Sequence, residues 1–164
     1  MQVAKLEIGF IEVPNCVSLD IYAVGCRNNC PNCHNPQLRD FNYPKRFTLT
    51  EKAFVEKIED SSGLIDGVCW LGGDCFYQPS AYKKLTRLVK ETNCELFNCL
   101  YTGVDFEIID SEMLIDTDIV IDGRWEGKVI SDPETNQRIF KKINNEWKKI
   151  TYEEFSSYSV EKCA

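Results

Sequence analysis

Three cysteines, Cys26, Cys30 and Cys33, follow a C-x3-C-x2-C spacing directly after the apolar, strand-like residues 18–24. Thiolates are soft ligands that suit iron–sulfur clusters, zinc or copper(I). A [4Fe–4S] cluster is usually held by four cysteines, one on each iron. Three cysteines from one loop would therefore leave one iron open to bind a substrate, and we expect the function of the chain at this loop.

Two other kinds of chemistry are compatible with part of this loop. The run Cys30-Pro-Asn-Cys33-His34 matches C-x-x-C-H, the signature of c-type haem attachment, and His34 is the single histidine of the chain. A redox dithiol could also use Cys30 and Cys33, provided that they open a helix. Both interpretations leave Cys26 without a role, so neither is preferred.

Zinc is the main alternative metal. A structural zinc site needs four closed ligands, which Cys30, Cys33, Cys94 and Cys99 could supply together. However, Cys94 and Cys99 lie in an apparent strand, where their odd spacing points them to opposite faces. Free cysteine is also a small apolar residue that is often buried. That role is our expectation for the six cysteines outside the loop: Cys16, Cys69, Cys75, Cys94, Cys99 and Cys163.

The composition indicates one acidic domain over residues 1–164. Lys and Arg number 19 and Asp and Glu 26, a net charge of −7, which argues against binding to nucleic acid or to an anionic membrane. No segment reaches the ~18 apolar residues of a membrane span. Lys5 and Glu7 interrupt the start of the chain where a signal peptide would be apolar, so we expect a cytoplasmic protein. Nine cysteines, an odd number, argue against a disulfide framework.

Strand and helix patterns alternate along the chain, which predicts parallel βαβ units in an α/β domain. The expected strands cover residues 5–13, 18–24, 66–71, 94–101 and 118–121, and the expected helices start after Thr50, at Pro79, near residue 106 and near residue 151. Residues 126–147 are expected to form a hairpin or a covering segment. Ligands of such sheets bind at the carboxyl ends of the strands. The cysteine loop, Gly72-Gly73-Asp74, Thr102-Gly103 and Asp122-Gly123 all follow strands, so we expect them to converge there.

At these residues the chain resembles the radical S-adenosylmethionine superfamily, whose C-x3-C-x2-C loop binds a [4Fe–4S] cluster. Gly72-Gly73-Asp74 resembles the Gly-Gly-Glu/Asp segment of that superfamily. Further segments resemble the glycyl-radical-enzyme activases, and among them the activating proteins of anaerobic ribonucleoside-triphosphate reductase. These segments are Cys26-Arg-Asn-Asn-Cys30-Pro-Asn-Cys33-His34-Asn35-Pro36, Leu71-Gly-Gly-Asp-Cys-Phe-Tyr-Gln78, Tyr101-Thr-Gly103, Val120-Ile-Asp-Gly123 and Asn136-Gln-Arg138.

The resemblance implies a partial (β/α) barrel with a mostly parallel curved sheet and two cofactors, the cluster and S-adenosyl-L-methionine. It implies that Cys26, Cys30 and Cys33 ligate iron, that Asn32, Cys33 and His34 border the adenine, and that Gly72, Gly73 and Asp74 hold the amino group of the cofactor. A helix N-cap is an alternative role for Asp74. Asp122 either faces the cofactor or ends a strand, and Asn136, Gln137 and Arg138 form a structural or partner-facing element.

The implied reaction begins with one-electron reduction of the bound S-adenosylmethionine, which yields methionine and a 5′-deoxyadenosyl radical. That radical would remove a hydrogen atom from a glycine of the large subunit of anaerobic ribonucleoside-triphosphate reductase. The implied partners are this subunit and a low-potential electron donor. Another glycyl radical enzyme, a peptide or a small molecule is the alternative substrate, and a zinc-stabilised binding module is the alternative outside enzymes.

Overall fold

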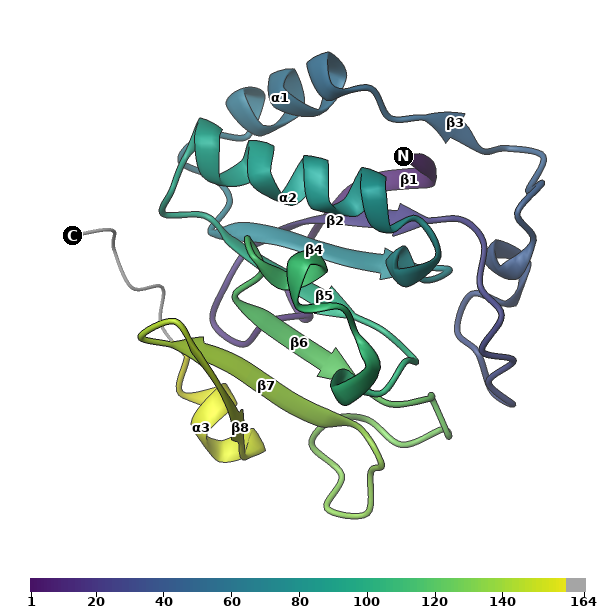
Figure 1. Ribbon diagram of the computed structural model, residues 1–164, viewed down its shortest axis with the longest axis vertical. Coiled ribbons are helices and arrows are strands. Elements are labelled where there is room, and N and C mark those ends of the chain that lie inside the picture. The colour runs from purple at the N-terminus through teal and green to yellow at the C-terminus, as the bar shows by residue number, and fades with distance from the viewer. Residues whose placement is uncertain (159–164) are drawn as a thin grey trace.

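One eight-stranded sheet organises the chain in the computed structural model, which describes residues 1–158 (Figure 1). Cys163 lies outside the described residues. None of the helices in the described range is long and apolar enough to cross a membrane. The strands are β1 (Gln2–Gly9), β2 (Ser18–Ala23), β3 (Phe47–Thr48), β4 (Gly67–Gly72), β5 (Phe97–Tyr101), β6 (Ile119–Asp122), β7 (Arg138–Ile143) and β8 (Glu146–Ile150). The helices are α1 (Glu51–Asp60), α2 (Pro79–Thr92) and α3 (Tyr152–Ser156), and the 3-10 turns are η1 (Pro36–Arg39), η2 (Cys75–Tyr77), η3 (Phe106–Ile108) and η4 (Ser111–Leu114).

The centre of the sheet is parallel and its two sides are antiparallel. The strand order is β3-β1-β2-β4-β5-β6-β7-β8, with parallel pairing from β2 through β6. The βαβ units expected from the sequence are thus confirmed, but the sheet is not mostly parallel. β1 pairs antiparallel with β2, and β7 pairs antiparallel with both β6 and β8. β3 and β8 are the edges of the order, so the described residues form an open sheet and not a closed barrel.

The two faces of the sheet are covered by different helices and pack against two separate hydrophobic cores. Helices α1 and α2 lie side by side over one face (Figure 1), where Trp70 packs against Phe54 and Tyr82 in the larger core. The opposite face holds a smaller core that includes Phe155 of the short helix α3. Side chains alternate between faces along a strand, so residues such as Tyr22 and Tyr101 point away from α1 and α2. Tyr22 and Tyr101 line a cavity on this face, beside the smaller core.

Local signals in the sequence account for the helix boundaries. Thr50 caps α1 by accepting a hydrogen bond from the Ala53 backbone N at 3.2 Å, and Pro79 opens α2, as expected. The strand boundaries differ more from those expected from the sequence. β1 ends at Gly9 instead of residue 13, because Val13 turns back into the smaller core. β5 begins at Phe97 instead of Cys94, which is exposed.

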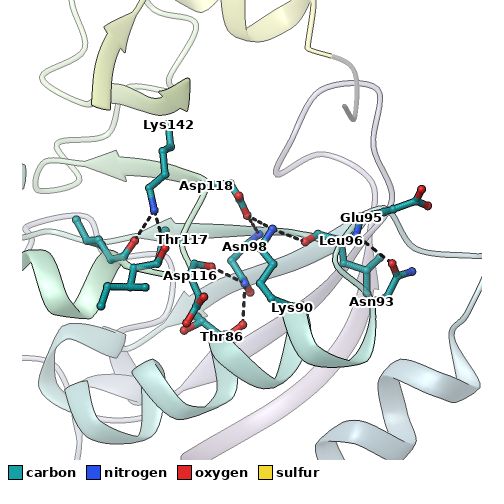
Figure 2. A network of polar contacts seen from close by, with 12 residues as sticks. Thr86, Lys90, Asn93, Glu95, Leu96, Asn98, Asp116, Thr117, Asp118 and Lys142 are labelled. Atoms are coloured by element: carbon teal, nitrogen blue, oxygen red, sulfur yellow. Dashed lines mark hydrogen bonds and ion pairs between the residues drawn. The ribbon is translucent and has the colours of Figure 1, made fainter. Parts of the chain in front are cut away.

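A polar network fastens α2 to the amino ends of β5 and β6 (Figure 2). The fully buried Asn98 donates from Nδ2 to the carbonyl oxygens of Thr86 and Asp116, and its Oδ1 accepts from Trp70 Nε1 at 3.0 Å. Its backbone N donates to the carboxylate of Asp118, which also pairs with Lys90. The Asn98 side chain therefore uses both N–H groups and its carbonyl within the protein.

Candidate iron–sulfur and cofactor site

A cavity of about 510 Å³ opens at the carboxyl ends of the parallel strands. Ligand pockets generally measure roughly 300–1,000 Å³. The cavity wall contains Cys26 with the rest of its loop, Gly72 and Gly73 at the end of β4, Thr102 and Gly103 after β5, and Gly123 after β6. The expected convergence of these loops is confirmed, because the carboxyl ends of parallel strands meet at one edge of a sheet.

The three loop cysteines all line this cavity. Cys26, Cys30 and Cys33 are partly buried free thiols. The pKa of Cys26 is raised to about 11, chiefly by burial and in smaller part by the Asp74 carboxylate and the other two thiols, while a hydrogen bond from the Asn28 backbone N opposes the shift. A metal cation bound at this loop would lower the pKa of the Cys26 thiol again, because a coordinating thiol loses its proton.

The glycines expected to contact the cofactor are also needed for close packing of the loops. A Cβ on Gly73 would lie 2.8 Å from the carbonyl oxygens of Gly25 and Leu38. A Cβ on Gly72 would lie 2.6 Å from the Ala23 carbonyl oxygen, and the φ of Gly72 is +95°. Larger residues are thus excluded where β4 passes the start of the cysteine loop. Both glycines still leave their main chain open to the cavity.

Asp74 lies beneath the cavity wall, 1 % exposed, and is not among the lining residues. Its carboxyl accepts hydrogen bonds from Asn28 Nδ2 (2.7 Å), Thr102 Oγ1 (2.8 Å) and the backbone N of Gly103 (3.0 Å). It also caps η2 by accepting from the Phe76 backbone N. Burial raises the pKa of Asp74, and these donors oppose the shift.

Asp74 therefore connects the cysteine loop to the ends of β4 and β5. The structure gives it the N-cap role that the sequence offered as an alternative. A direct contact with an amino group in the cavity stays a prediction, and such a contact would have to share an acceptor that a protein donor already uses.

The segment between β6 and β7 contacts the outer side of the cysteine loop. The His34 ring packs on Trp125 with 4.1 Å between the ring centroids, and both residues line the cavity. Asn32 is exposed beside Gly127 and does not line the cavity with its neighbours Cys33 and His34. The covering segment expected in this region of the sequence thus reaches the predicted adenine-binding residues.

Asp122 and Arg138 form a structural ion pair. Asp122 is fully buried at the end of β6, where it accepts from Arg138 and from the Phe106 backbone N. Arg138 also pairs through both terminal nitrogens with Glu107. Neither Asp122 nor Arg138 lines the cavity, whereas the neighbouring Gln137 does. Of the two roles offered for Asp122, the structure shows the one at the strand end.

The cavity extends over the sheet face toward the loop between β1 and β2. Glu12 lines it there, and the Glu12 carbonyl oxygen accepts from Tyr101 OH at 2.5 Å. Burial raises the pKa of the neighbouring Asp20 to about 7, helped by Glu12 and Glu7 and opposed by a hydrogen bond from Ser18. Glu12 thus brings a carboxyl group to this end of the cavity, while the cysteine end holds the thiols.

The donor set fits an iron–sulfur cube better than a single ion. Among residues 1–158, no three His, Cys, Asp or Glu side chains meet around one ion position. A cube binds each thiolate through a different iron, so its ligands stand apart, whereas structural zinc needs four ligands at one point. The zinc set also fails on topology, because Cys94 precedes β5, at the opposite edge of the sheet from Cys30 and Cys33.

Comparison with protein families agrees with this assignment. Residues 15–147 match the profile of a family described as a 4Fe-4S single cluster domain. The match covers most of the chain, so this chain belongs to that family and is an iron–sulfur protein. A cluster domain of this kind is compatible with an oxidoreductase. Comparison with curated proteins gave no match.

Several wall residues are not evident from the sequence. Asn28 connects Asp74 to Tyr77 OH, and Arg39 and Trp125 line the cavity from segments that carry no motif. The position of Asn28 between Cys26 and Cys30 is the one signal that could have singled it out. Arg39 and Trp125 reach the site through tertiary contacts, which residue spacing does not encode.

Proposed function

We propose that this chain is a radical S-adenosylmethionine activating enzyme. Its substrate would be a glycine in the large subunit of anaerobic ribonucleoside-triphosphate reductase, from which a hydrogen atom is removed to leave a glycyl radical. The observation that carries the proposal is the presence of three loop thiols in one cavity, which no other cysteine of residues 1–158 lines. The matched family is found in radical S-adenosylmethionine activating proteins.

Cys26, Cys30 and Cys33 would hold the [4Fe–4S] cluster and leave one iron for the amino and carboxylate groups of the cofactor. When bound, the cluster supplies the electron for reductive cleavage of S-adenosylmethionine. Gly72, Gly73 and the backbone after β5 form the adjoining wall, where a ligand can approach the main chain closely. This wall would orient the cofactor beside the thiols.

Two features of the cavity suit a protein substrate. Ile11 and Val129 line the cavity and are 86 % and 57 % exposed, so apolar side chains stand at its mouth. Exposed apolar groups around a pocket are typical of protein contact sites. Trp125, packed on the His34 ring, adds an aromatic surface to the cavity wall beside the cysteine loop. A flexible glycine-bearing segment of the partner could therefore enter and exclude solvent.

The test begins with anaerobic reconstitution with iron and sulfide. The wild-type chain should bind four irons per chain and, with dithionite and S-adenosylmethionine, release 5′-deoxyadenosine. Cys30→Ala should abolish both, because one of three protein ligands is lost. Cys94→Ala is the matched control, because this thiol is exposed at the opposite edge of the sheet, and it should leave both unchanged.

The partner is tested separately by electron paramagnetic resonance. The loaded enzyme, mixed with the large reductase subunit, should produce a glycyl radical signal on that subunit. Cleavage of S-adenosylmethionine without this signal would indicate a different substrate. Stoichiometric zinc after strictly anaerobic purification, with no four-iron cluster on reconstitution, would refute the proposal as a whole.

A further inference from the structure

Arg39 is a cation held in the cavity wall without an anionic partner. It is the one Lys or Arg among the lining residues of the cavity, and it is partly buried. Its Nη2 donates to the amide oxygen of Asn29, a neutral acceptor. Among residues 1–158, no carboxylate forms an ion pair with Arg39. A partly desolvated guanidinium of this kind lacks the counter-charge that such groups normally have.

The Nε atom of Arg39 strengthens this observation. It is buried and has no hydrogen-bond acceptor, and it is the one side-chain nitrogen or oxygen atom in this situation within the described chain. Buried polar groups are nearly always satisfied, so an exception needs an explanation. The absence of both a charge partner and an acceptor indicates that an anionic group belongs near this guanidinium.

Arg39 is hydrogen-bonded to the cysteine loop through both its backbone and its side chain. Its carbonyl oxygen accepts a hydrogen bond from the Cys26 backbone N at 3.1 Å, and the preceding Leu38 accepts from Gly25 at 2.7 Å. Asn29, which binds the guanidinium, lies between Cys26 and Cys30. The position of the charge is therefore tied to the position of the thiols.

We propose that Arg39 is the counter-charge of the iron–sulfur cluster and favours its reduced state. The inference rests on the proposed function, in that Cys26, Cys30 and Cys33 must hold the cluster. Three thiolates and the cluster sulfides are anionic, and one electron from the external donor adds a further negative charge. The reduction potential of an iron–sulfur cluster depends on net charge and on hydrogen bonds to its sulfurs. The positive charge of a guanidinium beside the cluster stabilises the added electron.

The test measures the reduction potential of the reconstituted cluster without S-adenosylmethionine. Arg39→Gln should lower the equilibrium constant for reduction about tenfold, which is about 59 mV for a one-electron couple. Arg39→Lys keeps the charge and should retain most of the wild-type potential. Arg27→Gln is the matched control, because Arg27 is an exposed cation of the same loop outside the cavity wall, and its potential should equal that of the wild type.

Each outcome decides the inference. A wild-type potential in Arg39→Gln would overturn it, and if that variant binds S-adenosylmethionine more weakly, the guanidinium serves the carboxylate of the cofactor instead. If Arg39→Gln does not retain a cluster, Arg39→Lys decides: retention with a near-wild-type potential supports the counter-charge, and loss in both variants overturns it in favour of a structural role. If the wild-type chain itself binds no four-iron cluster, the proposed function fails, which is a separate result.

Discussion

The parallel strands of the sheet have an amino edge and a carboxyl edge, where the strands begin and where they end. These two edges differ in how completely their buried polar groups are hydrogen-bonded. At the amino ends of β5 and β6, the buried Asn98 finds partners for both N–H groups and its carbonyl, and Lys90 pairs with Asp118 (Figure 2). At the carboxyl ends, three free thiols line a cavity together with Arg39, whose Nε has no acceptor within the described residues. A polar group without a protein partner is destabilising, so the carboxyl edge is arranged for a ligand and the amino edge for stability.

Asp74, like Asp122, departs from this pattern at the carboxyl edge, because its carboxyl has four donors from three segments. Asp74→Asn should have the largest effect on folding, lowering the free energy of unfolding by about 4 kcal/mol, since an amide in that place sets an N–H group against existing donors. Asp110→Asn is the matched control, an exposed cap of another 3-10 turn, and should change stability little. Urea denaturation of the cluster-free protein measures both. Equal effects would show that the Asp74 contacts contribute nothing beyond a cap.

Asn98 tests the opposite edge. Asn98→Leu should lower the free energy of unfolding by about 3 kcal/mol, because Trp70 Nε1 and two carbonyl oxygens lose buried partners. Cluster binding below the unfolding temperature should stay unchanged, since the network lies away from the cavity. Calorimetry and iron content of the reconstituted variant give the two readouts. Reduced iron binding by the folded variant would contradict the separation of the two edges.

Gly73 tests how closely β4 must pass the cysteine loop. Gly73→Ala should lower the free energy of unfolding by about 2 kcal/mol and reduce iron retention, because its Cβ meets backbone oxygens at 2.8 Å. Gly63→Ala is a control with no neighbour within 4 Å of its Cβ and a φ of +76°, so it carries backbone strain alone. That control should lose about 1 kcal/mol and no iron. The same iron content in both variants would show that the contact does not position the thiols.

Substitution of Asp20 should have the smallest effect, a change in how the stability of the fold depends on pH. The pKa of its carboxyl rises from 3.8 to about 7 on folding, so the folded state binds the proton more tightly than the unfolded chain. Its contribution to stability is therefore fully present below about pH 4 and lost as the pH rises toward 7. Asp20→Asn should flatten the fall in Tm over that window. An unchanged pH profile in the variant would show that Asp20 ionises normally beside the cavity.

Much of the site could be predicted because it follows from local sequence and sheet geometry. Cysteine spacing singles out the three thiols of the cavity wall, and alternating strand and helix patterns place their loop beside Gly73 and Gly103, since parallel strands end at one edge. The caps at Thr50 and Thr151 were equally accessible, because capping depends on residues within one turn. These features need no contact between distant parts of the chain.

Other features depend on which side chains meet after folding. The sequence offers a cofactor contact and a helix cap for Asp74, and it does not predict the hydrogen bonds that Asn28 and Thr102 donate to its oxygens from other loops. The sequence also leaves open how Arg39 is paired, because burial of its Nε without an acceptor arises only in the packed cavity wall. The cysteine spacing thus predicts the cysteine loop, and the alternation of strand and helix patterns predicts the parallel centre of the sheet. Tertiary packing determines which charges there remain uncompensated, because desolvation and partners are properties of the assembled structure.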